Sequence, residues 1–188
     1  MTIKHRLIQN FIRAAALLFA LQLFIVPSVA NAAAPPVSTC NSYLLADATT
    51  GDILFANKPN ERIYPASTTK IMTALVLLEN ESDLSKTVTV GSERDQVASD
   101  ASIMGLKKGE IISLKDLLYG LLLPSGADAA HTIAVDVGGT VSLFVDKMNA
   151  KAAQLKMTGT RFVNPDGMHD DNHYSTAADL AKLSIAAL

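Results

Sequence analysis

The chain has 188 residues, 49% of them hydrophobic, and a formal net charge of −2. This length suits one domain with a substantial hydrophobic core and leaves no room for a second full domain. The 16 Lys and Arg residues are scattered along the sequence without forming a basic patch, which argues against binding of nucleic acid.

The first 32 residues follow the pattern of a secretory signal peptide. An apolar stretch at 14–26 is too short to cross a membrane comfortably, and the small residues at 30 and 32 fit a cleavage site. A basic segment precedes the apolar stretch (Lys4, His5, Arg6, Arg13). We therefore expect 1–32 to be removed and 33–188 to act in the periplasm or outside the cell, after export across the inner membrane. An uncleaved membrane anchor is the alternative.

Two short apolar runs at 43–46 and 53–56 follow. They flank the polar segment 47–52, which ends in Gly51 and Asp52. Apolar runs around a loop of this kind predict a β-hairpin.

The segment PASTTKIMTALVLLE at 65–79 is apolar almost throughout and predicts a buried central helix. Ser67 and Lys70 stand at its start, where spacing i, i+3 places both side chains on one helical face. A neutral Lys70 amine can take the proton of the Ser67 hydroxyl if burial depresses the lysine pKa. The backbone N–H groups at the helix start can stabilise an oxyanion. The bland alternative makes Ser67 a helix cap and Lys70 a solvated residue.

Further along, a short strand is predicted at 88–90 and a loop at 91–105 that lines one wall of a cleft. Ser113 and Asp116 form a capping box for a helix that runs through Leu122. The region 107–110 reads as a turn.

Ser125 follows Pro124 in a short break before the next helix, which is predicted to end at 138–139. Placed between buried helices, Ser125 can point into a site and complete a relay with Ser67 and Lys70. It can equally cap the second helix, a role compatible with the first.

Thr140 is predicted to cap a helix through 156, and Thr176 to cap a last helix. That last helix has no stop signal, so we expect the sequence to end inside a larger fold. The spacing of His169 and His173 is that of metal ligands, but the intervening residues do not match a zinc-protease helix, and we expect no metal and no cofactor.

Three blocks of sequence support a family resemblance: PASTTKIMTAL, then LKKGE with SLKDLLYGLLLPSGADAA, then FVNPDGMHDDNHYSTAADLAKL. In this order they resemble the D-alanyl-D-alanine carboxypeptidases, which are low-molecular-mass penicillin-binding proteins, from Val37 to the end. The resemblance implies an α+β fold of the penicillin-binding protein and β-lactamase-like transpeptidase type. It has an N-terminal β-hairpin and a helical subdomain. Most of its antiparallel sheet, with a Lys-Thr-Gly strand, is expected after residue 188.

The resemblance also implies a reaction. Ser67 would form an acyl-enzyme, with Lys70 as general base and Ser125 passing the proton on. The reaction would remove the terminal D-alanine from peptidoglycan stem pentapeptides ending in D-Ala-D-Ala. β-Lactam antibiotics would acylate Ser67. Membrane contact would be made only through an anchor not present in this chain. Ala127 departs from the family, which usually carries an asparagine there.

Two rival readings stay open. The first is a β-lactamase, which shares the Ser67–Lys70 turn and the Ser125 loop. A β-lactamase must hydrolyse its acyl-enzyme efficiently, and no glutamate in this sequence has a context that resembles a deacylating one. A truncated, non-catalytic penicillin-binding fragment is the other.

Overall fold

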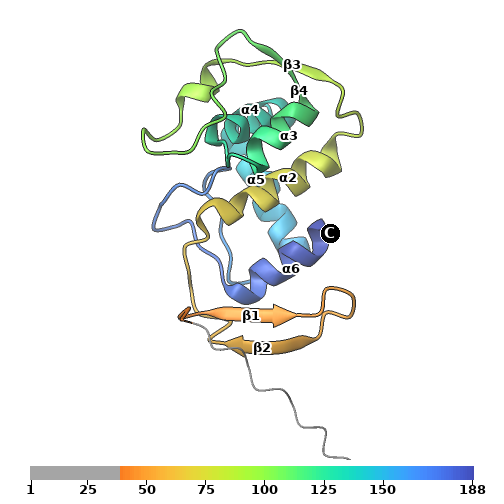
Figure 1. Ribbon diagram of the computed structural model, residues 1–188, viewed down its shortest axis with the longest axis vertical. Coiled ribbons are helices and arrows are strands. Elements are labelled where there is room, and N and C mark those ends of the chain that lie inside the picture. The colour runs from red at the N-terminus through yellow and green to blue at the C-terminus, as the bar shows by residue number, and fades with distance from the viewer. Residues whose placement is uncertain (1–38) are drawn as a thin grey trace, which may run out of the picture. The chain divides into compact units, whose positions relative to one another are not determined.

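A computed structural model describes residues 39–188, so the expected signal peptide at 1–32 lies outside the described residues. The elements in chain order are β1 (Tyr43–Ala46), β2 (Ile53–Asn57), the 3₁₀ turn η1 (Ala66–Thr68), α2 (Thr69–Asn80), β3 (Thr87–Thr89), the 3₁₀ turn η2 (Ser92–Asp95), β4 (Ile111–Ser113), α3 (Leu114–Leu122), α4 (Ala127–Gly138), α5 (Val141–Gln154) and α6 (Ala177–Ala187). Figure 1 shows α2 between the β1–β2 hairpin with α6 and the group formed by α3 and α4. This mixture of helices and short antiparallel strands confirms the predicted α+β class.

The predicted hairpin is confirmed, and β1 pairs with β2 in antiparallel register. The connecting loop closes because the Asp47 carboxylate accepts hydrogen bonds from the backbone N–H groups of Thr49 and Thr50. Gly51 there has φ of 78°, in the left-handed region that glycine adopts at little cost. The expected larger sheet is absent from the described residues, which hold only this pair and the separate pair β3–β4.

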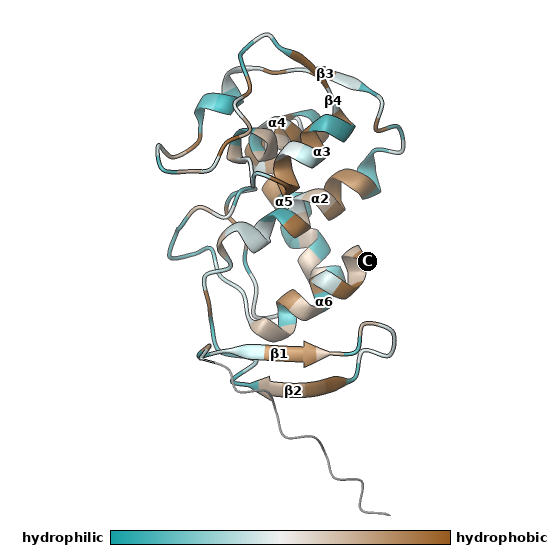
Figure 2. Cartoon of the chain, in the orientation of Figure 1, coloured by the Kyte–Doolittle hydropathy of each residue, from teal (hydrophilic) through white to brown (hydrophobic). Residues whose placement is uncertain are grey.

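Helix α2 is the predicted central helix and ends at Asn80, one residue beyond the predicted segment 65–79. Its buried residues lie all round the helix, as the continuous apolar sequence requires (Thr69, Lys70, Met72, Thr73, Ala74, Leu75, Val76, Leu77). They join one hydrophobic core with residues of the neighbouring helices, among them Leu117, Ile133 and Phe144. Figure 2 shows hydrophobic residues along α2 and α3 and hydrophilic ones in the surrounding loops.

Local capping signals account for the starts of α3, α5 and α6. The hydroxyl oxygens of Ser113, Thr140 and Thr176 each accept a hydrogen bond from a backbone N–H three residues on, at the starts of α3, α5 and α6. All three starts were predicted. Helix α5 ends at Gln154, two residues before the expected end.

Two short elements were not predicted. β4 has only three residues and pairs with β3, whose existence was predicted, and η2 interrupts the segment expected to be loop. A three-residue strand carries almost no periodic signal of its own, so only its partner defines it.

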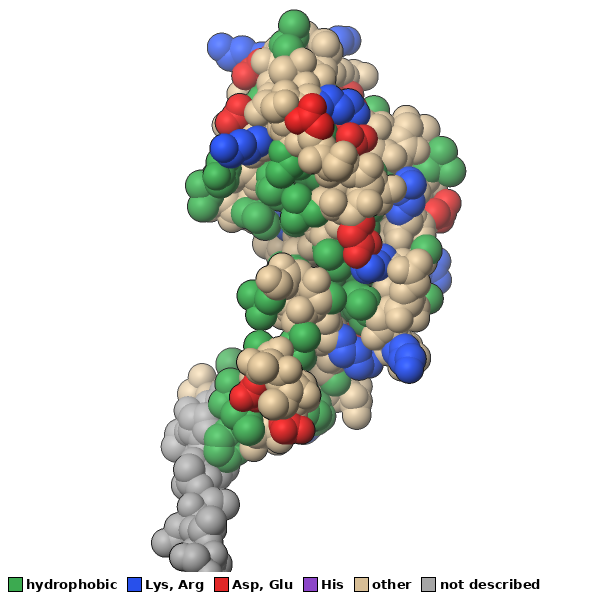
Figure 3. All heavy atoms as spheres, turned by 90° about the vertical axis from the view of Figure 1, so that its right-hand side faces the viewer, with side chains coloured by type: hydrophobic (Ala, Val, Ile, Leu, Met, Phe, Trp, Pro, Cys, Tyr) green, Lys and Arg blue, Asp and Glu red, His purple; other side chains and the backbone are tan. Residues whose placement is uncertain are grey.

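The surface carries charges of both signs. On the face drawn in Figure 3, Lys, Arg, Asp and Glu side chains alternate with hydrophobic ones over the described residues. None of the helices in residues 39–188 has the length and apolar character needed to cross a membrane.

Candidate active site

Ser67 lies in the 3₁₀ turn η1, directly before α2, and its side chain is exposed. The expectation that it caps the helix is wrong, because neither η1 nor α2 has a side-chain cap hydrogen bond. Thr68 instead bonds to the Pro65 carbonyl through both its N–H and its hydroxyl. Ala66 has φ of 48°, a conformation that costs an alanine energy and is found at sites where the backbone positions a functional group. The Ser67 hydroxyl is therefore left free of local capping.

Lys70 is buried, with 5% of its surface exposed, so the reading of a solvated lysine is wrong. Its Nζ lies 3.4 Å from the Ser67 Oγ, as the i, i+3 spacing predicted. The amine also donates to the backbone carbonyl of Asp166 at 2.5 Å. Burial lowers the pKa of Lys70 below the ordinary lysine value, and the Asp166 carboxylate opposes this by favouring the charged amine. The net lowered pKa is the shift that a lysine general base needs.

The loop that reaches Lys70 is fastened to α2 at several points. Thr73 donates to the Pro165 carbonyl at 2.6 Å, and the Thr69 hydroxyl lies 2.8 Å from His173 Nε2. Gly167, with φ of 86°, lies so close to the Ala66 carbonyl that a β-carbon would collide with it. The backbone on either side of Ser67 is thereby held against a loop from a distant part of the sequence.

Asp166 stands at the centre of this loop and is 3% exposed. One carboxylate oxygen accepts from the Met168 N–H at 3.1 Å, and the other lies 3.4 Å from His131 Nε2 on α4. Burial alone would raise the pKa of Asp166, but His131, Met168 and Lys70 together hold it below the ordinary value. The sequence alone gave no indication of the contact between Asp166 and Lys70.

His173 is buried and neutral in character. Its Nδ1 accepts from the Val163 N–H at 3.2 Å, which leaves Nε2 to carry the proton and donate to Thr69. Burial lowers the pKa of His173, against the opposing effect of Asp166 and Asp170.

Ser125 occupies the predicted break before α4. Its backbone is left-handed, with φ of 60°, and its Oγ is buried without a hydrogen-bond partner in the described chain. Gly126 is packed so closely that a β-carbon would lie 2.6 Å from the Gly120 carbonyl. The structure therefore joins Ser67 to Lys70 by a contact and leaves the hydroxyl of Ser125 unbonded.

Asp128 fixes the segment around Ser125. Its carboxylate accepts from the backbone N–H groups of Met104, Gly105 and Leu106 at 2.8 to 2.9 Å, and the Ala127 N–H donates to the Ser102 carbonyl. Ala127 is buried at the first position of α4 and presents only a methyl group. Sequence reasoning did not single out Asp128, although an acidic residue in the first turn of a helix is a known anchor for backbone N–H groups.

The His169 and His173 rings have different surroundings. His169 stacks edge-on against Tyr64 with ring centroids 4.6 Å apart, whereas His173 is buried against Thr69. Over residues 39–188, the structure contains no cluster of three His, Cys, Asp or Glu residues that could hold a metal ion.

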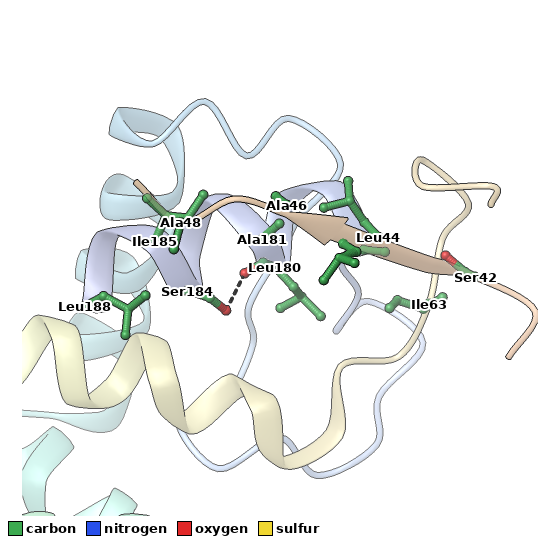
Figure 4. A pocket seen from close by; sticks show the side chains of 12 residues that line it. Ser42, Leu44, Ala46, Ala48, Ile63, Leu180, Ala181, Ser184, Ile185 and Leu188 are labelled. Carbon is green, nitrogen blue, oxygen red and sulfur yellow. Dashed lines mark hydrogen bonds between the residues drawn. The ribbon is translucent and has the colours of Figure 1, made fainter. Parts of the chain in front are cut away.

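An apolar hollow of about 460 Å³ lies elsewhere, between β1 and α6 (Figure 4). Leu44 and Ala46 on the strand face Leu180, Ala181 and Ile185 from the helix side. Neither Ser67 nor Lys70 lines this hollow.

A serine with a buried lysine at hydrogen-bonding distance is an arrangement that suits a nucleophile and base of the serine hydrolase type. The family model described as D-alanyl-D-alanine carboxypeptidase matches residues 29–188. The chain belongs to this family.

Individual relatives agree with the family. The chain is 38% identical over 145 residues to D-alanyl-D-alanine carboxypeptidase DacF of Bacillus subtilis, covering 74% of this chain and 36% of the relative. It is 37% identical over 165 residues to DacD of Escherichia coli, covering 82% and 42%. The chain thus spans less than half the length of these curated relatives.

Solved structures show the same fold. Penicillin-binding protein 6B of Escherichia coli has a TM-score of 0.78 at 34% identity, covering 84% of this chain and 52% of that one. A D-alanyl-D-alanine carboxypeptidase of Mycobacterium tuberculosis has a TM-score of 0.76 at 36% identity, covering 84% and 59%. The predicted penicillin-binding protein fold is confirmed for the part of the fold that this chain covers.

Proposed function

We propose that this protein is a serine-type D-Ala-D-Ala carboxypeptidase that removes the terminal D-alanine from peptidoglycan stem pentapeptides. The single observation that carries the proposal is the exposed Ser67 hydroxyl, 3.4 Å from the amine of the buried Lys70. Membership of the D-alanyl-D-alanine carboxypeptidase family supplies the substrate class.

Acylation starts with the neutral Lys70 amine taking the proton of the Ser67 hydroxyl. The serine oxygen then forms a bond to the carbonyl carbon of the penultimate D-alanine, and the peptide C–N bond breaks. The backbone N–H of Ser67 lies at a helix start, where such groups have no helical acceptor and are free to stabilise the oxyanion.

The leaving D-alanine amine needs a proton, and Ser125 is the proposed relay. Its hydroxyl passes a proton on to the amine and recovers one from the protonated Lys70. The unpartnered Ser125 Oγ supports this role, because a buried hydroxyl with no structural bond is free to exchange partners during the reaction. Water then hydrolyses the acyl-enzyme and releases the shortened stem peptide.

The surroundings of Lys70 support its role as base. Burial lowers the pKa of its amine, so the neutral form is more abundant at physiological pH than in an exposed lysine. The amine donates a hydrogen bond to the Asp166 carbonyl, and this bond orients the amine. The nitrogen lone pair of a neutral amine is not used in this bond and stays available to accept a proton.

The same chemistry predicts acylation by β-lactams, whose strained amide is attacked in place of the D-Ala-D-Ala bond. The test is incubation of the chain with a penicillin, followed by intact mass and peptide mapping. We expect one adduct, on Ser67, which the Ser67→Ala variant lacks. The Ser184→Ala variant, which loses only a hydroxyl bonded within α6, should be labelled like the parent chain.

Release of D-alanine from diacetyl-L-lysyl-D-alanyl-D-alanine tests the substrate. Release that depends on Ser67 supports a carboxypeptidase. Rapid, repeated hydrolysis of the penicillin identifies a β-lactamase instead, and a folded chain without an adduct is a non-catalytic penicillin-binding relative.

The proposed place of action is the periplasm or the cell exterior, where the peptidoglycan substrate lies. This rests on the predicted signal peptide at 1–32. A fusion of the N-terminal segment to a reporter active only outside the cytoplasm tests it, and a reporter that stays inactive contradicts it.

A further inference from the structure

His131 and Asp166 form a buried polar pair whose presence packing does not explain. Their exposed fractions are 6% and 3%, and His131 Nε2 lies 3.4 Å from Asp166 Oδ2, at the long end of hydrogen-bond distances. His131 Nδ1 is buried and has no partner in the described chain. A buried polar pair of this kind is frequently no more stabilising than a hydrophobic pair of the same volume, and an unsatisfied nitrogen adds a cost. A functional role accounts for such a pair better than stability does.

The pair contacts the candidate base, Lys70, through Asp166. The Asp166 side chain faces His131, while the backbone carbonyl of the same residue accepts the Lys70 amine at 2.5 Å. The Met168 N–H holds the second carboxylate oxygen. With both carboxylate oxygens engaged, the peptide unit that presents the carbonyl to Lys70 has a fixed orientation.

The partners come from three elements. Lys70 is on α2, Asp166 is in the loop after α5, and His131 is on α4. His131 stands one helical turn after Ala127, on the same face of α4. It is therefore the contact through which α4, the helix that follows Ser125, fixes the position of the Lys70 amine.

We propose that His131 and Asp166 are positioning residues for acylation: His131 holds the Asp166 carboxylate, and Asp166 in turn holds the Lys70 amine within reach of Ser67. This inference rests on the proposed function for its catalytic consequence. Its structural part, the effect of His131 on Lys70, is measurable without any reaction.

The charges around Lys70 give each variant a distinct signature. Asp166 faces the amine from the loop, His131 faces Asp166 from α4, and His173 is electrostatically linked to Asp166 from the end of the loop. His131→Leu loosens the loop and leaves the carboxylate without its donor, and both changes raise the pKa of Lys70. Asp166→Asn removes the negative charge and lowers it.

The first experiment is an NMR titration of the full chain labelled with ¹³C-lysine, with the Lys70 signal assigned by its loss in Lys70→Ala. We expect the Lys70 titration midpoint to rise in His131→Leu and to fall in Asp166→Asn. His131→Gln, which keeps a donor near the carboxylate, should stay close to the parent. A midpoint unchanged in His131→Leu overturns the proposal, whether or not the chain reacts with penicillin.

The second experiment separates the acylation rate constant from the binding constant for a fluorescent penicillin. Both His131→Leu and Asp166→Asn should acylate about tenfold more slowly or worse, as a misplaced base requires, with binding of the penicillin little changed. For Asp166→Asn this loss runs against its lowered lysine pKa, which by itself would increase the amount of free base. Slow acylation despite that shift is specific to positioning.

Thr132→Val is the matched control, because Thr132 is the next residue on α4, is 2% exposed and bonds only within its helix, to the Asp128 carbonyl at 2.9 Å. It should acylate at the parent rate. Circular dichroism and thermal unfolding check folding, and Asp166→Asn, which preserves shape, decides the question if His131→Leu does not fold. Acylation within about twofold of the parent in a folded Asp166→Asn overturns the proposal. A parent chain that forms no adduct refutes the proposed function, and the lysine titration then still decides the positioning role.

Discussion

The Lys70 amine donates to the backbone carbonyl of Asp166, a residue 96 positions further along the chain. The proposed nucleophile, Ser67, and the proposed base, Lys70, are neighbours in sequence, but the Lys70 amine is held by a loop that follows α5. The position of the Lys70 amine therefore depends on the packing of that loop against α2, and not on the first turn of the helix alone.

The lowered pKa of Lys70 predicts the pH dependence of acylation. Because the base must be neutral, the acylation rate should rise with pH through a midpoint below 10.5, the ordinary value for lysine. Burial of the amine is the dominant cause of this lowered pKa. Stopped-flow measurements with a fluorescent penicillin test this, and a midpoint at or above the ordinary value would contradict it.

Lys70→Arg should be inactive at every accessible pH in the same measurement, because the guanidinium group stays protonated.

Gly167 is predicted to accept no side chain. Its φ of 86° disfavours any other residue, and a β-carbon there would collide with the Ala66 carbonyl and approach Thr69 Oγ1. Gly167→Ala should lower the free energy of unfolding by about 1 to 3 kcal/mol for the backbone strain, with a further loss from the overlap. It should also slow acylation, because Ala66 adjoins Ser67, the proposed nucleophile.

Gly51→Ala is the control for that prediction. Gly51 has a comparable φ of 78° but no atom within 4 Å of the added carbon, so it isolates the strain. Denaturant unfolding of both variants compares them. Equal destabilisation by the two substitutions would show that the close approach at Gly167 carries no cost.

The local elements were predictable from sequence because their signals are local. Ser113, Thr140 and Thr176 each accept from an N–H three residues on, and the sequence between contains the information needed. The Ser67 and Lys70 contact was predictable for the same reason, since helical spacing alone brings the two together.

The rest of the site was not predictable, because it depends on contacts between distant segments. His131 belongs to a helix that was expected, but no periodicity indicates that it meets Asp166 beside Lys70. Ser125 was correctly placed before α4, whereas its proposed relay role stays a prediction. Ser67 does not cap the helix, since Pro65 and Thr68 form the turn without its hydroxyl.

His173 predicts how stability changes between mildly acidic and neutral pH. Burial places its folded-state pKa below the ordinary histidine value of 6.5, so the unfolded chain binds more protons in this range. Its contribution to stability is therefore complete above 6.5 and is lost progressively as the pH falls toward the folded-state pKa. Urea unfolding of the parent and of His173→Gln at several pH values tests this. The variant should show a weaker loss of stability on acidification, and an equal loss in both would assign the effect to other groups.

Asp128 is predicted to be among the most sensitive positions near the candidate site. Its fully buried carboxylate accepts from the N–H groups of Met104, Gly105 and Leu106, and no other acceptor for them is present in the described structure. Asp128→Ala leaves these donors unpaired and should lower the free energy of unfolding by about 2 to 5 kcal/mol. Because the same helix start positions Ser125, any folded fraction should also acylate more slowly.

Asp100→Ala is the control, at an exposed position of the same loop, and should change the free energy of unfolding by less than about 0.5 kcal/mol. Thermal and denaturant unfolding measure both variants, and a mild effect at Asp128 would mean that water replaces the carboxylate and that the loop does not depend on it.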